Sequence, residues 1–150
     1  GARVYSSPSL RGELGYYPLL PAPGADELCG AAFPRYAYQW HHDGFDIPRG
    51  GRLLAEGAGD FPNQAFVYGD NVVGLQFHPE VTYQMICRWT TRGAAKLVAA
   101  GGRPQEHREG WFRYDRGLES WIGAFLPSWA DDALNCPCSP ADVGLAIAAE

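Results

Sequence analysis

The stretch from Gly74 to Val81 constrains the fold more than any other part of the sequence. It is an apolar run that ends in His78-Pro79-Glu80. Pro79 has no N–H with which to continue a β ladder, so it predicts the end of a strand. Side chains at positions i and i+2 of an extended backbone point to the same side. The pattern therefore predicts that His78 and Glu80 lie together at the tip of a strand.

This pair has the chemistry of a base and the group that orients it. A carboxylate beside an imidazole fixes the tautomer of the ring and stabilises the imidazolium, as in nucleophile triads. From spacing alone, a strand-end histidine beside a solvated glutamate remains the plainer alternative. A triad also needs a nucleophile, usually on a strained strand-to-helix elbow flanked by small residues. None of the cysteines has that setting, whether Cys29, Cys87, Cys136 or Cys138.

The residues around this motif predict strands first and helices afterwards. Strands are predicted at 4–5, 13–20, 35–40, 53–56, 64–68 and 72–77, with a short helical turn within 26–32. Pro18 suggests an edge position for the second of these strands, and Gly69-Asp70-Asn71 is typical of a hairpin turn. Mixed strands followed by helices indicate an α/β three-layer domain.

Helical periodicity begins directly after Glu80. Val81, Met85, Ile86 and Trp89 have helical spacing, with Thr82 as the N-cap. This helix is predicted to break near Gly93, continue over 94–100 and stop at Gly101-Gly102. A polar stretch, 103–109, precedes a second helix with a stripe of apolar residues from Leu118 to Leu126, which Pro127 ends. The residues beyond Trp129 are predicted to form a tail.

Composition excludes several classes of function. The chain has 150 residues, a formal net charge of −5 and a pI near 5.3, and its basic residues are scattered, so we expect one domain and no nucleic-acid partner. No apolar stretch approaches the roughly 20 residues that span a bilayer, so we expect no membrane association. The first residues lack the apolar segment of a signal peptide, and the irregular spacing of the cysteines suggests a reducing environment, so we expect a cytoplasmic location. The cysteines suggest neither a disulfide framework nor a metal site.

Two segments resemble a known family. Gly74 to Val81 is similar to the His-x-Glu signature of the class I, triad-type glutamine amidotransferases. The upstream segment from Tyr38 to Pro48 (YQWHHDGFDIP) resembles the one those domains carry before their last hairpin. The resemblance covers roughly residues 1–101 and is closest to the subgroup similar to the amidotransferase domain of GMP synthase.

The resemblance implies a three-layer α/β/α, flavodoxin-like fold with a central, mostly parallel sheet. The family's nucleophile is a cysteine in a Gly-x-Cys-x-Gly elbow, N-terminal to everything seen in this chain. We therefore expect residues 1–101 to be the C-terminal part of an amidotransferase domain, 102–129 a helical extension of it, and 130–150 a disordered tail. A shortened form of a longer protein, a gene fragment and a degenerate homologue all remain open.

The resemblance also implies an activity, glutamine amide hydrolysis by a Cys-His-Glu triad. His78 and Glu80 would be its catalytic residues in this chain, and His41, His42 and Asp43 would help to bind the substrate, partly through main chain. No metal or organic cofactor would be needed, and the ammonia would pass to a synthetase or acceptor domain. Two alternatives remain: a γ-glutamyl peptidase or hydrolase on the same scaffold, and a non-catalytic binding module. Adjacent histidines on a strand point to opposite faces, which argues against a metal site at His41 and His42.

Overall fold

Seven strands and four helices make up the part of the chain that the computed structural model describes, residues 1–7 and 11–135. The strands are β1 Val4–Ser6, β2 Glu13–Pro21, β3 Tyr36–His41, β4 Asp43–Phe45, β5 Gly51–Gly57, β6 Asn63–Tyr68 and β7 Val72–Leu75. The helices are α1 Ala25–Cys29, α2 Tyr83–Arg92, α3 Ala94–Ala99 and α4 Pro104–Asn135. Each predicted strand therefore corresponds to a strand of the structure, and the predicted helical turn to α1.

Five strands form one sheet in the order β3-β2-β5-β6-β7, and β1 pairs with β4 in a separate ribbon. Every pairing among the described strands is antiparallel. For β5–β6 and β6–β7 the short connections allow only this direction, because a parallel neighbour needs a longer crossover connection. The hairpin at Gly69 joins β6 to β7 as predicted, with Tyr68 paired to Val72. The parallel strands that we expected at the centre of the sheet are not among the pairings of residues 1–7 and 11–135.

Pro18 does not mark an edge strand, because β2 lies between β3 and β5. The strand pairs with β3 up to Pro18 and with β5 only from Leu19 onward. The N–H of Leu19 donates to Arg35 O on the β3 side over 2.9 Å, so the nitrogen of Pro18 faces the other side. At Pro18, β5 has not yet begun to pair with β2, so the N–H that proline lacks is not needed for a hydrogen bond of the sheet.

The helix after Glu80 begins where the sequence predicts. The Thr82 hydroxyl accepts a hydrogen bond from the N–H of Met85, which caps the first turn of α2. Gly93 separates α2 from α3, and Gly101 follows α3 with a φ of 79°. These positions confirm the predicted break and stop.

Helix α4 corrects the prediction for the C-terminal region. It starts at Pro104, within the polar stretch that was expected to precede the helix with the apolar stripe, and Pro127 lies inside it rather than at its end. It continues to Asn135, so the predicted tail boundary at 130 is wrong for residues 130–135. The remaining tail residues, 136–150, lie outside the described part of the chain.

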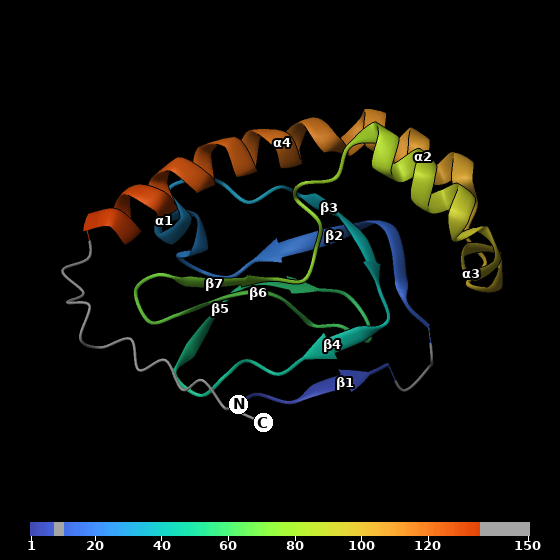
Figure 1. Ribbon diagram of the computed structural model, residues 1–150. Helices are drawn as coiled ribbons and strands as arrows, with labels where there is room; N and C mark the ends of the chain where they lie inside the picture. The colour runs from blue at the N-terminus through green and yellow to red at the C-terminus, as the bar shows by residue number, and fades with distance from the viewer. Residues whose placement is uncertain (8–10, 136–150) are drawn as a thin grey trace, which may run out of the picture.

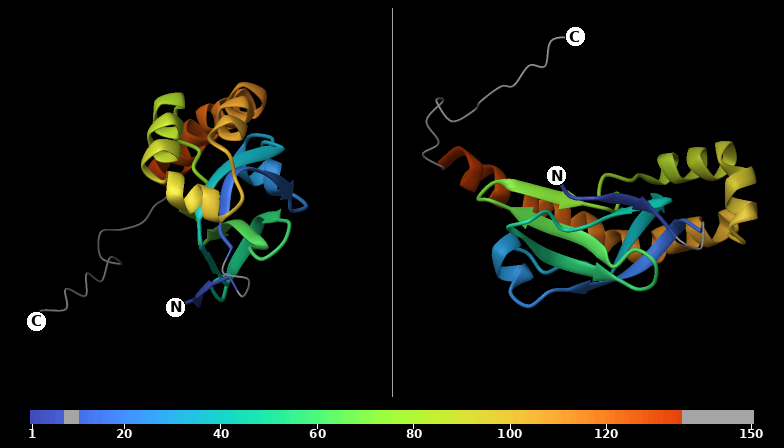
Figure 2. Two further views of the ribbon diagram at one scale, coloured as in Figure 1. Left: turned by 90° about the vertical axis from the view of Figure 1, so that its right-hand side faces the viewer. Right: turned by 90° about the horizontal axis from the view of Figure 1, so that it is seen from below.

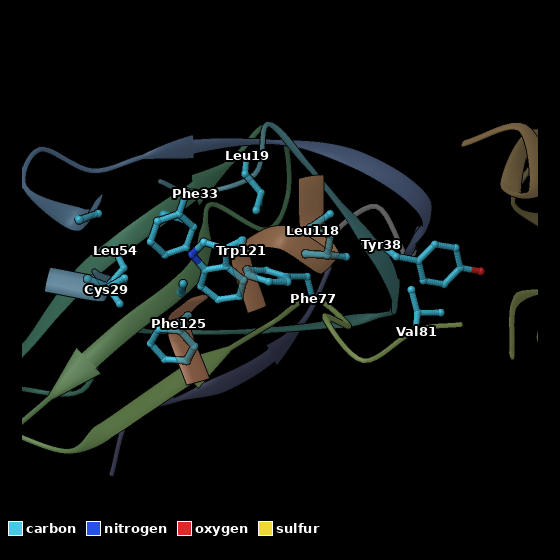
Figure 3. Close-up of a cluster of buried hydrophobic side chains, with 14 of the residues drawn as sticks. Leu19, Cys29, Phe33, Tyr38, Leu54, Phe77, Val81, Leu118, Trp121 and Phe125 are labelled. Carbon is cyan, nitrogen blue, oxygen red and sulfur yellow. The ribbon is translucent and has the colours of Figure 1, made fainter. Parts of the chain in front are cut away.

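Helices α2, α3 and α4 lie together on one side of the five-stranded sheet (Figures 1 and 2). The core forms where α4 packs against the sheet, and Trp121 of the predicted apolar stripe lies at its centre (Figure 3). The Trp121 ring lies 5.0 Å from Phe33 and 5.6 Å from Phe77 between ring centroids. Phe77 immediately precedes His78, so the packing of α4 helps to fix the end of β7.

Candidate active site

The predicted pair lies in the loop that leads from β7 to α2. Two backbone hydrogen bonds hold this loop against the sheet: Gln76 N donates to Gln64 O, and His78 N donates to Tyr38 O, each over 2.9 Å. His78 Nδ1 lies 2.8 Å from Glu80 Oε1. The structure therefore brings the two side chains into direct contact, as their spacing predicts.

This contact determines which nitrogen of His78 is free. A carboxylate only accepts hydrogen bonds, so Nδ1 carries the proton and Nε2 of a neutral ring keeps its lone pair. Within residues 1–7 and 11–135 no side chain is hydrogen-bonded to Nε2. The His78 side chain is 32% exposed, and its ring meets that of Trp89 edge to face with centroids 4.9 Å apart. His78 is therefore an imidazole with an oriented ring and an open nitrogen.

The segment predicted to bind substrate lies beside this loop. Gln76 Nε2 donates to the carbonyl oxygen of Asp43 over 3.1 Å, which joins the start of β4 to the end of β7. The Asp43 carboxylate accepts from the Ser6 hydroxyl over 2.7 Å. His42 is exposed, whereas the His41 ring is largely buried and hydrogen-bonded. Substrate binding by His41, His42 and Asp43 stays a prediction.

His41 is the last residue of β3, and His42 lies in the bend between β3 and β4, so the two are not adjacent residues of one strand. No group of three or more His, Cys, Asp or Glu side chains in the described residues is arranged to hold a metal ion.

His107 of α4 is a buried residue that the sequence analysis missed. Its Nδ1 lies 2.9 Å from the Tyr38 hydroxyl, and burial lowers the pKa of the imidazole below its usual value. The ring packs over Gly15 of β2, whose φ of 120° favours glycine. Extending the apolar stripe of α4 backwards by helical steps, from Leu118 through Asp115 and Trp111 to His107, would have revealed it.

Cys29 is placed poorly for a nucleophile. The thiol is buried in the core, and burial together with the nearby Asp26 raises its pKa to about 11. Figure 3 shows Cys29 at the opposite end of the cluster from Val81, which follows Glu80 in the chain. Cys87 is half-buried within α2, and the other two cysteines lie outside the described residues.

A pocket with mostly apolar walls borders Glu80. It lies between β7, which contributes Val73 and Leu75, and the C-terminal half of α4, which contributes Phe125 and Trp129. Glu80 therefore contacts His78 and also borders this apolar pocket.

The comparison with known proteins finds similar solved structures. No protein-family model matches the sequence, and no curated protein matches it significantly. A glutamine amidotransferase from Thermotoga maritima has a similar structure, with a TM-score of 0.75 and 29% identity over 87% of this chain. A glutamine amidotransferase from Methylobacillus flagellatus is similar as well, with a TM-score of 0.74 and 25% identity over 88% of this chain.

The match covers 56% of the length of each of these two proteins, so the chain spans little more than half of either. In the part of the chain that the structure describes, no helix has both the length and the apolar character needed to cross a membrane. The sheet with its covering helices and the two structural matches agree with the expected fold class. The chain therefore has the α/β fold of the class I glutamine amidotransferases.

Proposed function

We propose that this chain carries the base and the orienting carboxylate of a glutamine-hydrolysing site. A cysteine thiolate attacks the side-chain amide carbon, and the imidazolium of His78 gives its Nε2 proton to the departing ammonia. His78 then takes a proton from the water that hydrolyses the thioester and releases glutamate. Glu80 orients the ring and stabilises its charged form. This half-reaction needs neither a metal nor an organic cofactor.

The observation that supports this proposal most is the 2.8 Å contact between His78 Nδ1 and Glu80 Oε1. It leaves Nε2 as the nitrogen that exchanges protons with the reaction. The ring is held by Trp89 and the backbone by Tyr38, so the base is oriented before any substrate binds.

The nucleophile has to come from outside the described residues. Cys29 is buried, its thiol pKa is raised, and it lies away from the loop of the pair. The neighbours from Thermotoga and Methylobacillus are longer, and their additional length is the natural place for a nucleophile elbow. We further propose that the complete protein acts on glutamine or a γ-glutamyl compound and delivers ammonia to a synthetase or acceptor domain.

The same observation about Cys29 favours a second candidate, a non-catalytic binding module. Without an activated thiol the oriented base has nothing to deprotonate, and the fold would serve recognition only. Under this alternative, the pair would contribute to ligand binding or to the stability of the loop after β7.

A substrate panel separates these candidates. The chain is co-expressed with the N-terminal remainder of the Thermotoga neighbour, and release of ammonia or amine is measured with glutamine and with γ-glutamyl peptides. Glutamine hydrolysis supports the proposal, and cleavage of γ-glutamyl peptides alone identifies a peptidase. A stable complex that hydrolyses neither supports the binding module. The isolated chain, which should be inactive, is the control.

A further inference from the structure

Four side chains form a hydrogen-bonded network on the face of β3 that points away from α4. They are Glu13 of β2, Gln39 and His41 of β3, and Gln64 of β6. Glu13, Gln39 and Gln64 are 5%, 0% and 1% exposed, and the His41 side chain is 11% exposed. Glu13 and His41 are direct partners in the β2–β3 register. A buried carboxylate among neutral amides requires a compensating partner.

The hydrogen bonds of the two amides fix their orientation. Gln64 Nε2 donates to the Phe61 carbonyl oxygen over 2.9 Å and to Glu13 Oε2 over 3.1 Å, which uses both of its protons. Gln64 Oε1 accepts from Gln39 Nε2 over 2.6 Å. The Oε1 atom of Gln39 consequently points at His41.

Both nitrogens of His41 face acceptors. Nδ1 lies 3.0 Å from the Asp43 carbonyl oxygen, which can only accept. Nε2 lies 3.1 Å from Gln39 Oε1 and 3.2 Å from Glu13 Oε2. A neutral imidazole has one proton, so one nitrogen would direct its lone pair at an oxygen, and a buried unmade hydrogen bond of this kind is costly.

We propose that His41 is a doubly protonated imidazolium paired with the buried carboxylate of Glu13, and that it positions the 41–43 segment. If Glu13 were instead the protonated partner, the lone pair of Nε2 would face Gln39 Oε1. The imidazolium satisfies all three acceptors. Its Nδ1–H and the amide of Gln76 converge on the Asp43 carbonyl, which ties the start of β4 to the loop that carries His78.

The surroundings of the ring hold few other charges. The rings of Phe61 and His41 pack edge to face with centroids 4.7 Å apart, and the carboxylate of Asp43 accepts a hydrogen bond from Ser6. Arg11 and Asp60 line the same pocket as Glu13, and Asp60 accepts from Ser7. Glu13 is thus the carboxylate in direct contact with the His41 ring among the described residues. This inference needs no catalytic activity, so it can fail or succeed independently of the proposed function.

Nitrogen NMR of the imidazole rings tests the charge state directly. The complete chain is labelled with ¹⁵N, and two-bond ¹H–¹⁵N correlations are recorded at pH 7, with His41 assigned by its loss in His41→Gln. Both nitrogens of His41 should show the shifts of protonated nitrogens at this pH. A single protonated nitrogen on His41 in the folded wild-type chain at pH 7 would overturn the proposal.

Matched variants test the pairing. Glu13→Gln should convert His41 to a singly protonated ring, and Glu56→Gln, which changes an exposed glutamate on β5, should leave it doubly protonated. If Glu13→Gln leaves His41 doubly protonated, Glu13 is not its partner. The wild-type spectrum decides the charge state even if Glu13→Gln does not fold.

A second pair of variants tests positioning. His41→Asn keeps a donor near the Asp43 carbonyl, whereas His41→Gln places its donor near Glu13. The side-chain amide signal of Gln76 should therefore move in His41→Gln and stay close to its wild-type position in His41→Asn. A positioning role of His41 would be contradicted if the Gln76 signal moved equally in the two variants. It would also be contradicted if the exposed control His42→Gln moved that signal as far as His41→Gln does.

Discussion

The backbone N–H of His78 donates to the carbonyl oxygen of Tyr38 over 2.9 Å. The hydroxyl of the same tyrosine is hydrogen-bonded to His107 of α4 over 2.9 Å. Tyr38 therefore links the long helix to the loop that carries the proposed base. The position of α4 therefore bears on the position of the His78 backbone through Tyr38.

Acid should weaken the folded state through His107. Burial lowers the pKa of this imidazole from 6.5, so below about pH 6.5 the unfolded chain binds a proton that the folded chain does not. The contribution of His107 to the free energy of unfolding then falls as the pH decreases, by at most about 1.4 kcal/mol per pH unit for one proton. The proposed imidazolium of His41 contributes with the opposite sign, so the test compares urea unfolding of wild type and His107→Gln between pH 7.5 and 5.5. The free energy of unfolding of the wild type should fall relative to that of His107→Gln as the pH decreases; a difference that does not change with pH would contradict this role of His107.

In a glutamine-hydrolysing complex of this chain with the co-expressed N-terminal segment, Glu80→Gln should reduce the rate of hydrolysis less than His78→Ala. The amide oxygen of glutamine can still accept from Nδ1–H, so the ring keeps its orientation and loses only the stabilising charge. By analogy with other triads, we expect the difference in kcat to be on the order of tenfold or more. Steady-state kinetics on both variants provide the measurement. An equal or larger loss for Glu80→Gln would be inconsistent with the assigned roles.

Gly74 should not tolerate a side chain. A Cβ at this position would overlap the ring of its cross-strand partner Phe66, which packs against Phe45. We expect Gly74→Ala to lower the free energy of unfolding by about 1–3 kcal/mol, the usual cost of overpacking. Gly117→Ala is the matched control: nothing lies near its Cβ, and helix α4 should gain about 0.5–1 kcal/mol. Equal effects of the two substitutions on chemical denaturation would refute this packing argument.

Cys29 should react slowly with alkylating agents. Cys29 is 3% exposed, and burial raises the pKa of its thiol to about 11. Cys87 on α2 is only half-buried. Since the thiolate is the reactive form, iodoacetamide at pH 8 should modify Cys87 well before Cys29. Peptide mapping by mass spectrometry gives both rates. Preferential labelling of Cys29 in the folded chain would reopen it as a nucleophile.

Local signals in the sequence predicted much of the fold around the pair. The turn at Gly69, the Thr82 cap and the break at Gly93 each depend on the conformational preference of one residue or a few neighbours. These three features need no knowledge of distant packing, which is why the sequence alone was sufficient. The contact between His78 and Glu80 was predicted as well, but the structure places it in the loop after β7, which ends at Leu75, and not at the tip of an extended strand.

Features that depend on distant residues were missed or wrongly placed. Pro127 predicted the end of a helix, yet Trp129 beyond it donates its indole N–H to Asn71 O over 3.0 Å and lines the pocket beside β7. Tertiary packing of this kind overrides local propensity. The network of Glu13 and His41 depends on the β2–β3 register, and His107 on the position of α4 over Gly15. Neither relationship can be read from neighbouring residues.

The most direct measurement for the central claim is ammonia release from glutamine by the complemented protein. We predict that hydrolysis is lost on alkylation of the cysteine in the added segment, on its substitution by Ser and on His78→Ala, while Glu56→Gln, which changes an exposed glutamate on β5, retains it. Complexes of the same stability should form in every case, as analytical ultracentrifugation can establish. Glutamine hydrolysis that persists in a stable His78→Ala complex would contradict the assignment of His78 as the base.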